Sequence, residues 1–419
     1  MVKKYVVSFF LLTSLIVSAQ SGSVSPYSFS GLGEVNFRGT HANRTMGGVE
    51  VFTDSIHLNL LNPGSYGDLK FTTYSLGVNY KLNNFAATDV SNARATANLD
   101  YLAIGVPAGI FGFGFGVVPY SSVGYRVETR ALTDTGVNSI NRFEGEGGLN
   151  QAFVSVGIPF LKYFNVGATI NYGFGNVLNQ TAQIIEGITN GSYLSNQSSI
   201  SGLSYNLSAN VNIPLFKKYY FKGMYALQPE AGLTSRNLQT FFTQSIDGGS
   251  LVDFEEINLA ATGDDITSIN LTKTNRIGIG FGQSSKWFLG AQLNYINSSN
   301  FKNEFFQQKN ISYQDARQIS VGGFYIPQYN SFSSYWKRVV YRFGLRSEKS
   351  SLVINNIPLT ENGISFGMGL PMRGLSNANV GIEIGQRGEK SSQQFKESYF
   401  SLRIGLSLND IWFIKRKFN

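Results

Sequence analysis

The sequence of 419 residues contains no cysteine, so neither a disulfide nor a lipid-modified cysteine contributes to the protein. Charged residues are scarce as well, at 14% of the chain against about 25% in typical soluble domains. After the first 20 residues there is no apolar run of the ~18 residues that a transmembrane helix requires. These absences exclude a disulfide-stabilised secreted domain and a membrane protein built from helices.

Histidine is nearly absent too, with His41 and His57 as its two occurrences. A pair so far apart, without cysteine, is a poor zinc signature, and a hydrolytic nucleophile would need a histidine base. The acidic pairs at 144–146 and 264–265 lack the spacing of a calcium loop. We therefore predict no enzyme activity, no catalytic residues, no metal and no cofactor, and we expect both histidines to be hydrogen-bonded or solvated.

Basic residues do not form a patch for nucleic acid. The formal net charge is +8, but the one basic run is Lys415-Arg416-Lys417 at the end of the chain. A nucleic-acid surface would combine clustered Lys and Arg with aromatic platforms on one element. We predict that nucleic acid is not a partner and that residues 411–419 form a short basic tail.

The N-terminal residues have the three parts of a secretory signal. Lys3 and Lys4 precede an apolar stretch over 5–16, and Val17-Ser18-Ala19 is a small-residue cleavage site. The apolar stretch is too short to span a bilayer of about 30 Å as a helix. Residues 1–19 are therefore expected to be a signal peptide, with the mature chain starting at Gln20.

The residues after position 70 alternate between apolar and polar or small side chains in many short segments. Glycine (46 residues) and aromatics (14%) are abundant, and no linker divides the segments. In lipid, only a closed sheet leaves no backbone group unpaired. We predict an all-β protein whose residues 70–410 form a transmembrane antiparallel β-barrel of about 14 strands. Representative segments are 71–80, 99–107, 111–119, 219–228, 237–246 and 398–408.

The stretch 111–116, FGFGFG, allows two interpretations. A glycine-rich phosphate loop would have to be followed by the start of a helix, whereas Val117-Val118-Pro119 follows here. In a barrel strand, the phenylalanines would face lipid and the glycines a crowded lumen. We favour the strand.

Turn lengths suggest an orientation, because barrels of this class place short turns in the periplasm and long loops outside. We expect both chain ends on the periplasmic side. The tight links are 161–163, 216–218 and 284–286, and the expected long polar loops are 179–201, 247–271 and 328–336.

Residues 27–66 fit no regular element. Six glycines and Pro63 interrupt any helix or strand, yet the segment is rich in apolar residues. Since disordered segments are poor in such residues, we predict that residues 20–69 form an irregular hatch inside the lumen. Arg38, Arg44 and Asp54 would pair with lumen carboxylates or with each other; the alternative is that they bind a ligand carboxylate.

This hatch resembles that of the FadL/TodX family of outer-membrane transporters of hydrophobic compounds. The likeness lies in Gly31-Leu32-Gly33, Met46-Gly47-Gly48 and Asn62-Pro63-Gly64, where Gly64 replaces the alanine usual in the family. Late stretches at 324–327, 341–344 and 412–417 suggest a divergent branch. The residues assigned to the hatch motif are Gly31, Gly33, Asn43, Arg44, Met46, Gly47, Gly48, Asn62 and Pro63.

The resemblance implies uptake of fatty-acid-like or aromatic molecules across the outer membrane of a Gram-negative cell, with exit through an opening in the barrel wall. Phe29, Met46 and Phe52 would line the ligand pocket, and outer-membrane lipid would surround the barrel. The alternative is an accessory barrel that binds partner proteins in a secretion or barrel-assembly machine. In that case, side chains can fill the lumen.

Overall fold

The computed structural model describes residues 22–87, 91–133, 136–216, 218–247, 249, 251–306, 310–372, 374, 376–390 and 394–411. The expected signal peptide and the tail from Trp412 onwards lie outside these residues. No helix in the described part of the chain is long and apolar enough to cross a membrane.

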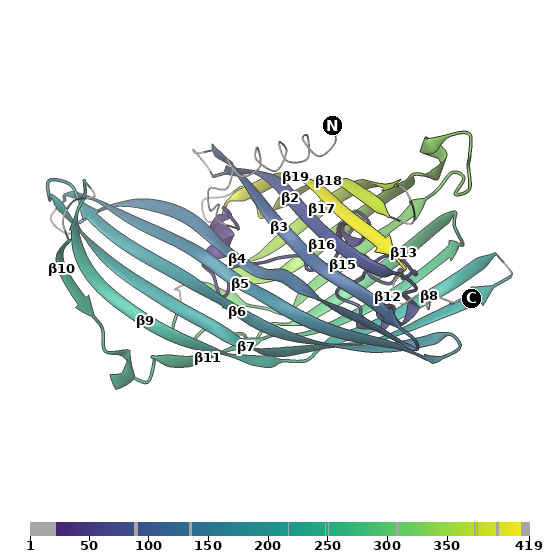
Figure 1. Ribbon diagram of the computed structural model, residues 1–419. Helices are drawn as coiled ribbons and strands as arrows, with labels where there is room; N and C mark the ends of the chain where they lie inside the picture. The colour runs from purple at the N-terminus through teal and green to yellow at the C-terminus, as the bar shows by residue number, and fades with distance from the viewer. Residues whose placement is uncertain are drawn as a thin grey trace, which may run out of the picture.

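The strands form one antiparallel β-barrel of 14 strands, which closes where β19 pairs with β2 (Figure 1). This confirms the predicted fold class. The strands are β2(Thr72–Ala86), β3(Ser91–Ala108), β4(Phe111–Leu132), β5(Asn138–Leu161), β6(Phe164–Ile185), β7(Asn190–Leu215), β8(Tyr219–Gln228), β9(Ala231–Ser245), β10(Leu251–Glu256), β11(Ile266–Leu271), β12(Lys273–Gln283), β13(Trp287–Asn297), β14(Ile311–Tyr313), β15(Ala316–Tyr325), β16(Val340–Ile354), β17(Ile357–Pro371), β18(Asn377–Arg387) and β19(Lys396–Asp410).

Three barrel strands are interrupted, which is why more than 14 segments carry labels. β8 and β9 were expected as separate strands, but both pair with β7 and together make one crossing. The break falls at Pro229, which has no N–H to donate to a ladder. β10, β11 and β12 likewise make one crossing, with the short helix η3(Leu259–Ala261) between the first two, and so do β14 and β15.

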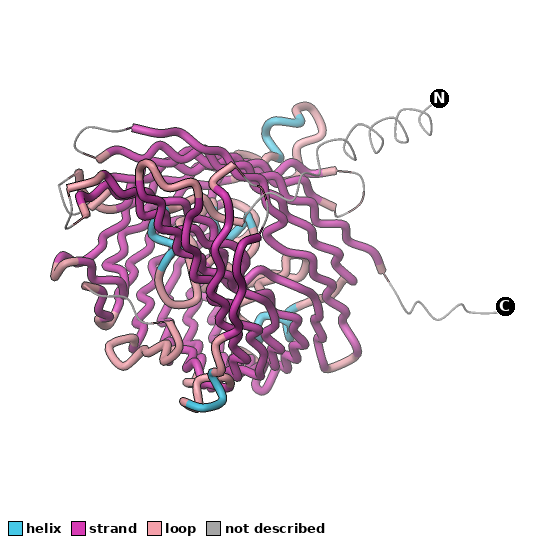
Figure 2. The backbone as a smooth tube through the Cα atoms, turned by 90° about the vertical axis from the view of Figure 1, so that its left-hand side faces the viewer, coloured by secondary structure: helices cyan, strands magenta, loops and turns pink. Residues whose placement is uncertain are grey.

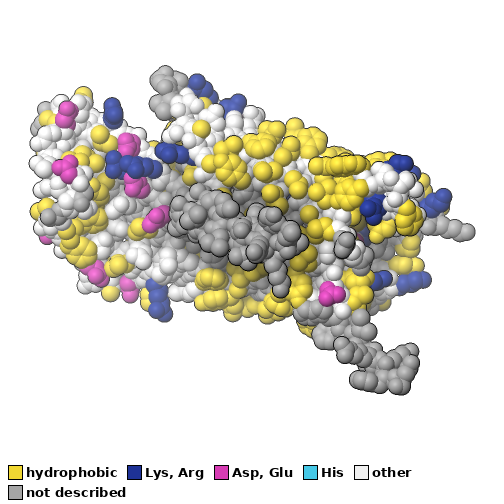
Figure 3. Space-filling model, turned by 45° about the horizontal axis from the view of Figure 1, so that its top comes forward, with side chains coloured by type: hydrophobic (Ala, Val, Ile, Leu, Met, Phe, Trp, Pro, Cys, Tyr) yellow, Lys and Arg dark blue, Asp and Glu magenta, His cyan; other side chains and the backbone are white. Residues whose placement is uncertain are grey.

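Side chains alternate between an apolar outer face and a polar lumen. The outward residues include Phe111, Phe113 and Phe115. The two glycines between them face Tyr66 of the N-terminal segment, and a Cβ added to either glycine would overlap the backbone or the ring of Tyr66. The strand interpretation of FGFGFG is therefore correct. Figure 3 shows the resulting hydrophobic band across the barrel, with charged side chains gathered towards its ends.

One end of the barrel, which we call the extended end, carries the longest hairpins. β4 to β7 have 22 to 26 residues each. On their outer face Arg126 lies 3.1 Å from Glu144, and Arg142 lies 2.8 Å from Glu128. Because charges facing lipid are destabilising, this part of the sheet lies beyond the hydrocarbon layer.

The prediction of a long loop over 179–201 is wrong, because β6 and β7 continue through most of it. Polar residues on both faces suit a strand that stands in water, so polarity alone did not mark a loop there. The stretch 247–271 also contains two short strands and η3.

The opposite end, the tight-turn end, holds the links near 162, 217 and 285. It also holds the 328–336 segment with the helix η4(Tyr335–Arg338), since Tyr325 pairs with Trp287 beside the tight link. This segment was expected among the long loops of the other end. The length of this segment therefore did not predict the end of the barrel on which it lies.

The N-terminal segment also runs differently from the prediction. It was expected to enter from the tight-turn end. Instead, the carbonyl of Gly22 accepts a hydrogen bond from Asn98, in the half of β3 nearer the extended end. The segment then descends through the lumen to Thr72, which pairs with Asp410 at the tight-turn end. Figure 2 shows its helical and loop segments within the ring of strands.

Removing residues 399–419 should abolish assembly, because β2 and β18 would then each have an unpaired edge in lipid. We expect loss of the heat-modifiable band on gels of outer membranes. Removing only residues 415–419 is the control and should leave that band unchanged. Normal membrane levels of the longer truncation would contradict the role of β19 in closure.

Candidate functional site

The lumen segment of residues 22–69, called the hatch segment below, is the candidate functional site. It has little regular structure, and its elements are η1(Pro26–Phe29), β1(Glu34–Val35), α2(His41–Arg44) and η2(Pro63–Asp68). Its backbone conformation depends on glycine. Four of the residues assigned to the hatch motif adopt a positive φ that other residues rarely adopt: Gly31, Gly33, Gly47 and Gly48.

Glycines of the barrel wall let the hatch backbone approach closely. A Cβ at Gly344 would overlap the backbone of Gly47, and a Cβ at Gly322 would overlap the carbonyl of Met46. The glycines at 157 and 167 make the same close approach to Pro63. The abundance of glycine in the strands therefore has a second use: it forms a cradle for the hatch segment.

Two asparagines of the motif hold this backbone with their side chains. Asn62 Oδ1 accepts hydrogen bonds from Ser208 and Asn210 of β7, each at 2.8 Å. Asn43 Nδ2 donates to the carbonyl of Val49 at 3.0 Å, which fixes the turn after α2. Asn62 thus ties the hatch segment to the wall, and Asn43 ties it to itself.

A network of ion pairs joins the hatch segment to the strands on either side of the closure. Arg44 binds Glu383 of β18 through both oxygens, at 2.6 and 2.7 Å. Glu34 lies 3.3 Å from Lys81 of β2 and 2.9 Å from Arg387 of β18. These pairs are buried, so breaking one of them would leave an uncompensated charge.

The network continues through the wall residues. Arg346 contacts Glu361 and Glu383, and Tyr399 of β19 hydrogen-bonds to the same two carboxylates. His41 of the hatch segment lies 2.7 Å from Asp100, which in turn pairs with Arg403 at 2.9 Å.

The three charged hatch residues singled out in the sequence have three different outcomes. Arg44 pairs with a lumen carboxylate, as expected. Asp54 pairs within the hatch segment, with His57 at 2.6 Å. Arg38 has no ion pair among the described residues and instead donates to the amide oxygens of Gln151 and Gln228.

Burial and neighbouring charges oppose each other at the hatch carboxylates. Burial by itself would raise the pKa of Glu34, but Lys81 and Arg387 outweigh it and lower the pKa to about 2. Burial also opposes ionisation of Asp54, where His57 and nearby backbone N–H groups lower the pKa to about 2. Both groups are therefore ionised at neutral pH in the folded barrel.

The residues expected to line a ligand pocket lie in two separate apolar clusters. Met46 packs with Phe288 and Phe324, and the ring centroid of Phe52 lies 5.0 and 4.9 Å from those of the same two residues. Phe29 lies elsewhere, against Tyr125. The structure brings Met46 and Phe52 together but not Phe29, and their role in ligand binding stays a prediction.

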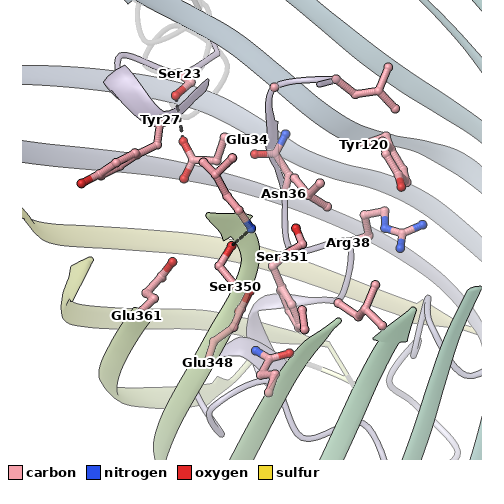
Figure 4. A pocket seen from close by; sticks show the side chains of 18 of the residues that line it. Ser23, Tyr27, Glu34, Asn36, Arg38, Tyr120, Glu348, Ser350, Ser351 and Glu361 are labelled. Carbon is pink, nitrogen blue, oxygen red and sulfur yellow. Dashed lines mark hydrogen bonds between the residues drawn. The ribbon is translucent and has the colours of Figure 1, made fainter. Parts of the chain in front are cut away.

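The described residues leave cavities around the hatch segment. A lumen cavity of about 340 Å³ lies between the hatch segment and the barrel wall, with Arg38 and Tyr120 on one side and Glu361 on the other (Figure 4). A vestibule of about 790 Å³ at the tight-turn end is lined by residues that include Phe52, His57 and Lys222. The third, of about 570 Å³, lies at a gap in the wall.

The wall gap lies between β3 and β4. Their ladder joins residues 102–108 of β3 only to residues 111–117 of β4. Nearer the extended end, Glu34 and Val35 of β1 pair with β4 instead. The gap cavity reaches from Phe37 of the hatch segment to Leu99 and Phe174, whose side chains are exposed on the outer face.

The wall residues that bind the hatch segment were missed in the sequence. A signal was available, because Glu383 and Arg387 share the face of the predicted strand opposite to that of Ile382 and Ile384, which marks their face as the one turned to the lumen. Within the described part of the chain, no three His, Asp or Glu residues are placed to hold a metal ion.

Substituting Gly344 by alanine should weaken hatch docking, because the added Cβ meets backbone that cannot rotate away. We expect a loss of about 1–3 kcal/mol, seen as a lower temperature of conversion to the heat-modified form. Gly173→Ala is the control, since it also faces the lumen but its nearest atoms lie 3.7 Å from the added Cβ. Equal shifts in both variants would argue against the cradle.

Acid should loosen the hatch segment. Because the pKa of Glu34 falls from 4.5 to about 2 on folding, its ion pairs contribute fully above pH ~4.5 and are lost as the pH falls towards 2. We expect amide exchange in residues 22–69, corrected for intrinsic rates, to accelerate between pH 5 and pH 3. Glu34→Gln should show a smaller pH dependence; an unchanged dependence would assign the effect to other groups.

Comparison with solved structures confirms a FadL/TodX-like fold. The Ralstonia pickettii toluene transporter TbuX has a TM-score of 0.60 at 13% identity, with 89% of this chain and 99% of that chain covered. The Pseudomonas putida toluene transporter TodX gives 0.54 at 14% identity, covering 90% and 99%. A Pseudomonas aeruginosa FadL homologue gives 0.53 at 11% identity, covering 90% and 98%.

These neighbours are transporters or channels and not enzymes. No curated protein matches the sequence. A family model, described as BamG, matches residues 1–419, and the chain therefore belongs to the BamG family.

Proposed function

We propose that the protein is an outer-membrane accessory barrel that binds partner proteins, with its hatch segment as a fixed part of the structure. The observation that carries this proposal is the use of the lumen surface. Its buried apolar side chains pack on the hatch segment, and its charges pair with it. The lumen cavity that remains beside the hatch segment is lined by charged as well as apolar side chains.

The energetics favour a fixed hatch. A lipid-like ligand gains ~0.8 kcal/mol for each CH₂ that it buries in apolar surroundings. The lumen cavity places buried charges, among them Glu34, Glu361 and Arg387, beside its apolar residues, and an alkyl chain gains nothing from those charges. Moving the hatch segment aside would also separate the Arg44–Glu383 pair, and breaking a buried pair costs about 3–5 kcal/mol.

The extended end supplies surface for a partner. After Val117, the edge of β4 that faces β3 pairs only with β1 among the described residues, and β10 pairs only with β9. Unpaired edges are sites where another chain can add a strand. The BamG family match is compatible with this function.

Uptake of hydrophobic molecules is the second candidate, and the wall gap is the observation that favours it. The gap connects Phe37 with the outer face at Leu99 and Phe174, and the similar folds include two proteins described as toluene transporters. An apolar molecule would pass sideways into the membrane by this route. It would still have to enter a lumen that the hatch segment blocks.

A disulfide that locks the hatch segment distinguishes the two candidates. A Cβ at Gly381 would lie 3.6 Å from that of Thr45, within the range for a disulfide, and the natural chain has no cysteine to interfere. We expect the oxidised Thr45→Cys, Gly381→Cys double variant to retain every protein that co-purifies with the wild type in mild detergent.

The same double variant under reducing conditions is the matched control. Uptake of toluene into cells is measured in parallel with purification. Toluene uptake that requires the protein and stops on oxidation would overturn the accessory function. A stoichiometric protein partner retained in both redox states would support it.

A further inference from the structure

Two arginines face the lumen cavity away from the ion-pair network. Arg276 of β12 is only 4% exposed, and its buried Nη1 atom has no hydrogen-bond partner among the described residues. Arg38 of the hatch segment donates to Gln151 and Gln228 at 3.2 Å each, and its guanidinium lies 4.7 Å from the ring centroid of Tyr120.

These two arginines contrast with the others that line the same cavity. Arg44, Arg387 and Arg403 each have a carboxylate within 2.9 Å, and Arg346 contacts Glu361. Within the described part of the chain, neither Arg38 nor Arg276 has an ion pair. A buried cation without a paired anion is costly.

Glu50 is the carboxylate whose charge acts on both arginines, but it does not neutralise them. It forms no ion pair with either arginine in the described chain, and its Oε2 atom is buried without a hydrogen-bond partner. Burial raises the pKa of Glu50, although Arg276 and Arg38 oppose the shift. The site has two guanidinium groups and at most one negative charge, so it lacks an anion.

We propose that the lumen cavity binds a small carboxylate-bearing ligand between Arg38 and Arg276. A guanidinium group presents a planar pair of donors that matches a carboxylate, and the free Nη1 of Arg276 supplies one of them. Tyr120 would flank the ligand on one side. This site stands independently of the proposed partner-binding function, because it needs neither an open hatch nor a partner protein.

The neighbouring amides do not compete for the ligand. Gln292 donates to Asn294 at 2.9 Å, and Asn294 donates to Gln318 at 2.8 Å, so these side chains satisfy one another along the wall. The Oε1 atom of Gln292 accepts from the backbone N–H of Glu50. The arginine donors are the groups left for an incoming anion.

The test is calorimetric titration of the full-length barrel in a non-ionic detergent with acetate, hexanoate and hexanol. We expect both carboxylates to bind and hexanol not to bind. Since a hydrogen bond to a charged group contributes about 1.5–3 kcal/mol, Arg276→Gln should weaken carboxylate binding roughly tenfold to a hundredfold. Arg38→Gln should act in the same direction.

Arg317→Gln is the matched control, because Arg317 of β15 lies two strands away, is exposed and contacts Tyr295. It should bind carboxylates like the wild type. Heat-modifiability on gels verifies that each variant is folded. If Arg276→Gln fails to fold, Arg276→Lys takes its place. This variant keeps the charge but not the planar pair of donors, and it should bind carboxylates with intermediate affinity.

Tighter binding of hexanoate than of acetate would identify the ligand as a carboxylate with an apolar chain, and equal binding as a small organic acid. Either result supports the site. The proposal is overturned if neither carboxylate binds, if hexanol binds as well as hexanoate, or if removing the Arg276 guanidinium leaves binding unchanged.

Discussion

The structure depends on one constraint: backbone groups in a hydrocarbon layer have no water to bind, so the sheet must pair with itself all the way round. The ladder between β19 and β2 meets this requirement, with pairing from Thr72–Asp410 to Ala86–Lys396. Closure creates a lumen, and in this barrel a single N-terminal segment occupies much of it. The alternation of side chains then follows, with apolar groups towards lipid and small or polar groups towards the hatch segment.

The lumen combines two kinds of contact that serve different purposes. Glycines such as Gly344 remove side-chain volume, so that hatch backbone can lie directly on the wall. Ion pairs such as Arg44–Glu383 fix its position, because a shifted hatch would leave both charges buried and unpaired. Arg38 and Arg276 depart from this scheme. Their lack of a paired carboxylate is the reason that one side of the cavity is suited to an anion.

The wall gives up strand pairing in one place. Between Ser91 and Tyr101, β3 is separated from β4, and β1 of the hatch segment covers a short part of the free edge of β4. Beyond it, β4 to β7 continue past the apolar band and carry charges on their outer face. The same sheet is thus a membrane wall at one level and a water-exposed surface at the next, which gives the barrel both a lateral gap and unpaired edges.

The sequence by itself determined the fold class, the approximate strand number, the outward phenylalanines of FGFGFG and an irregular hatch, because period-2 alternation and glycine or proline placement are local properties. It also indicated that Arg44 would find a carboxylate, though not which one. Only the tertiary structure decided that Glu383 and Arg387 face the hatch, that β8 and β9 are one crossing, and that residues 179–201 extend a hairpin. These features depend on which residues meet across the lumen and on where the membrane ends, and a local pattern contains neither.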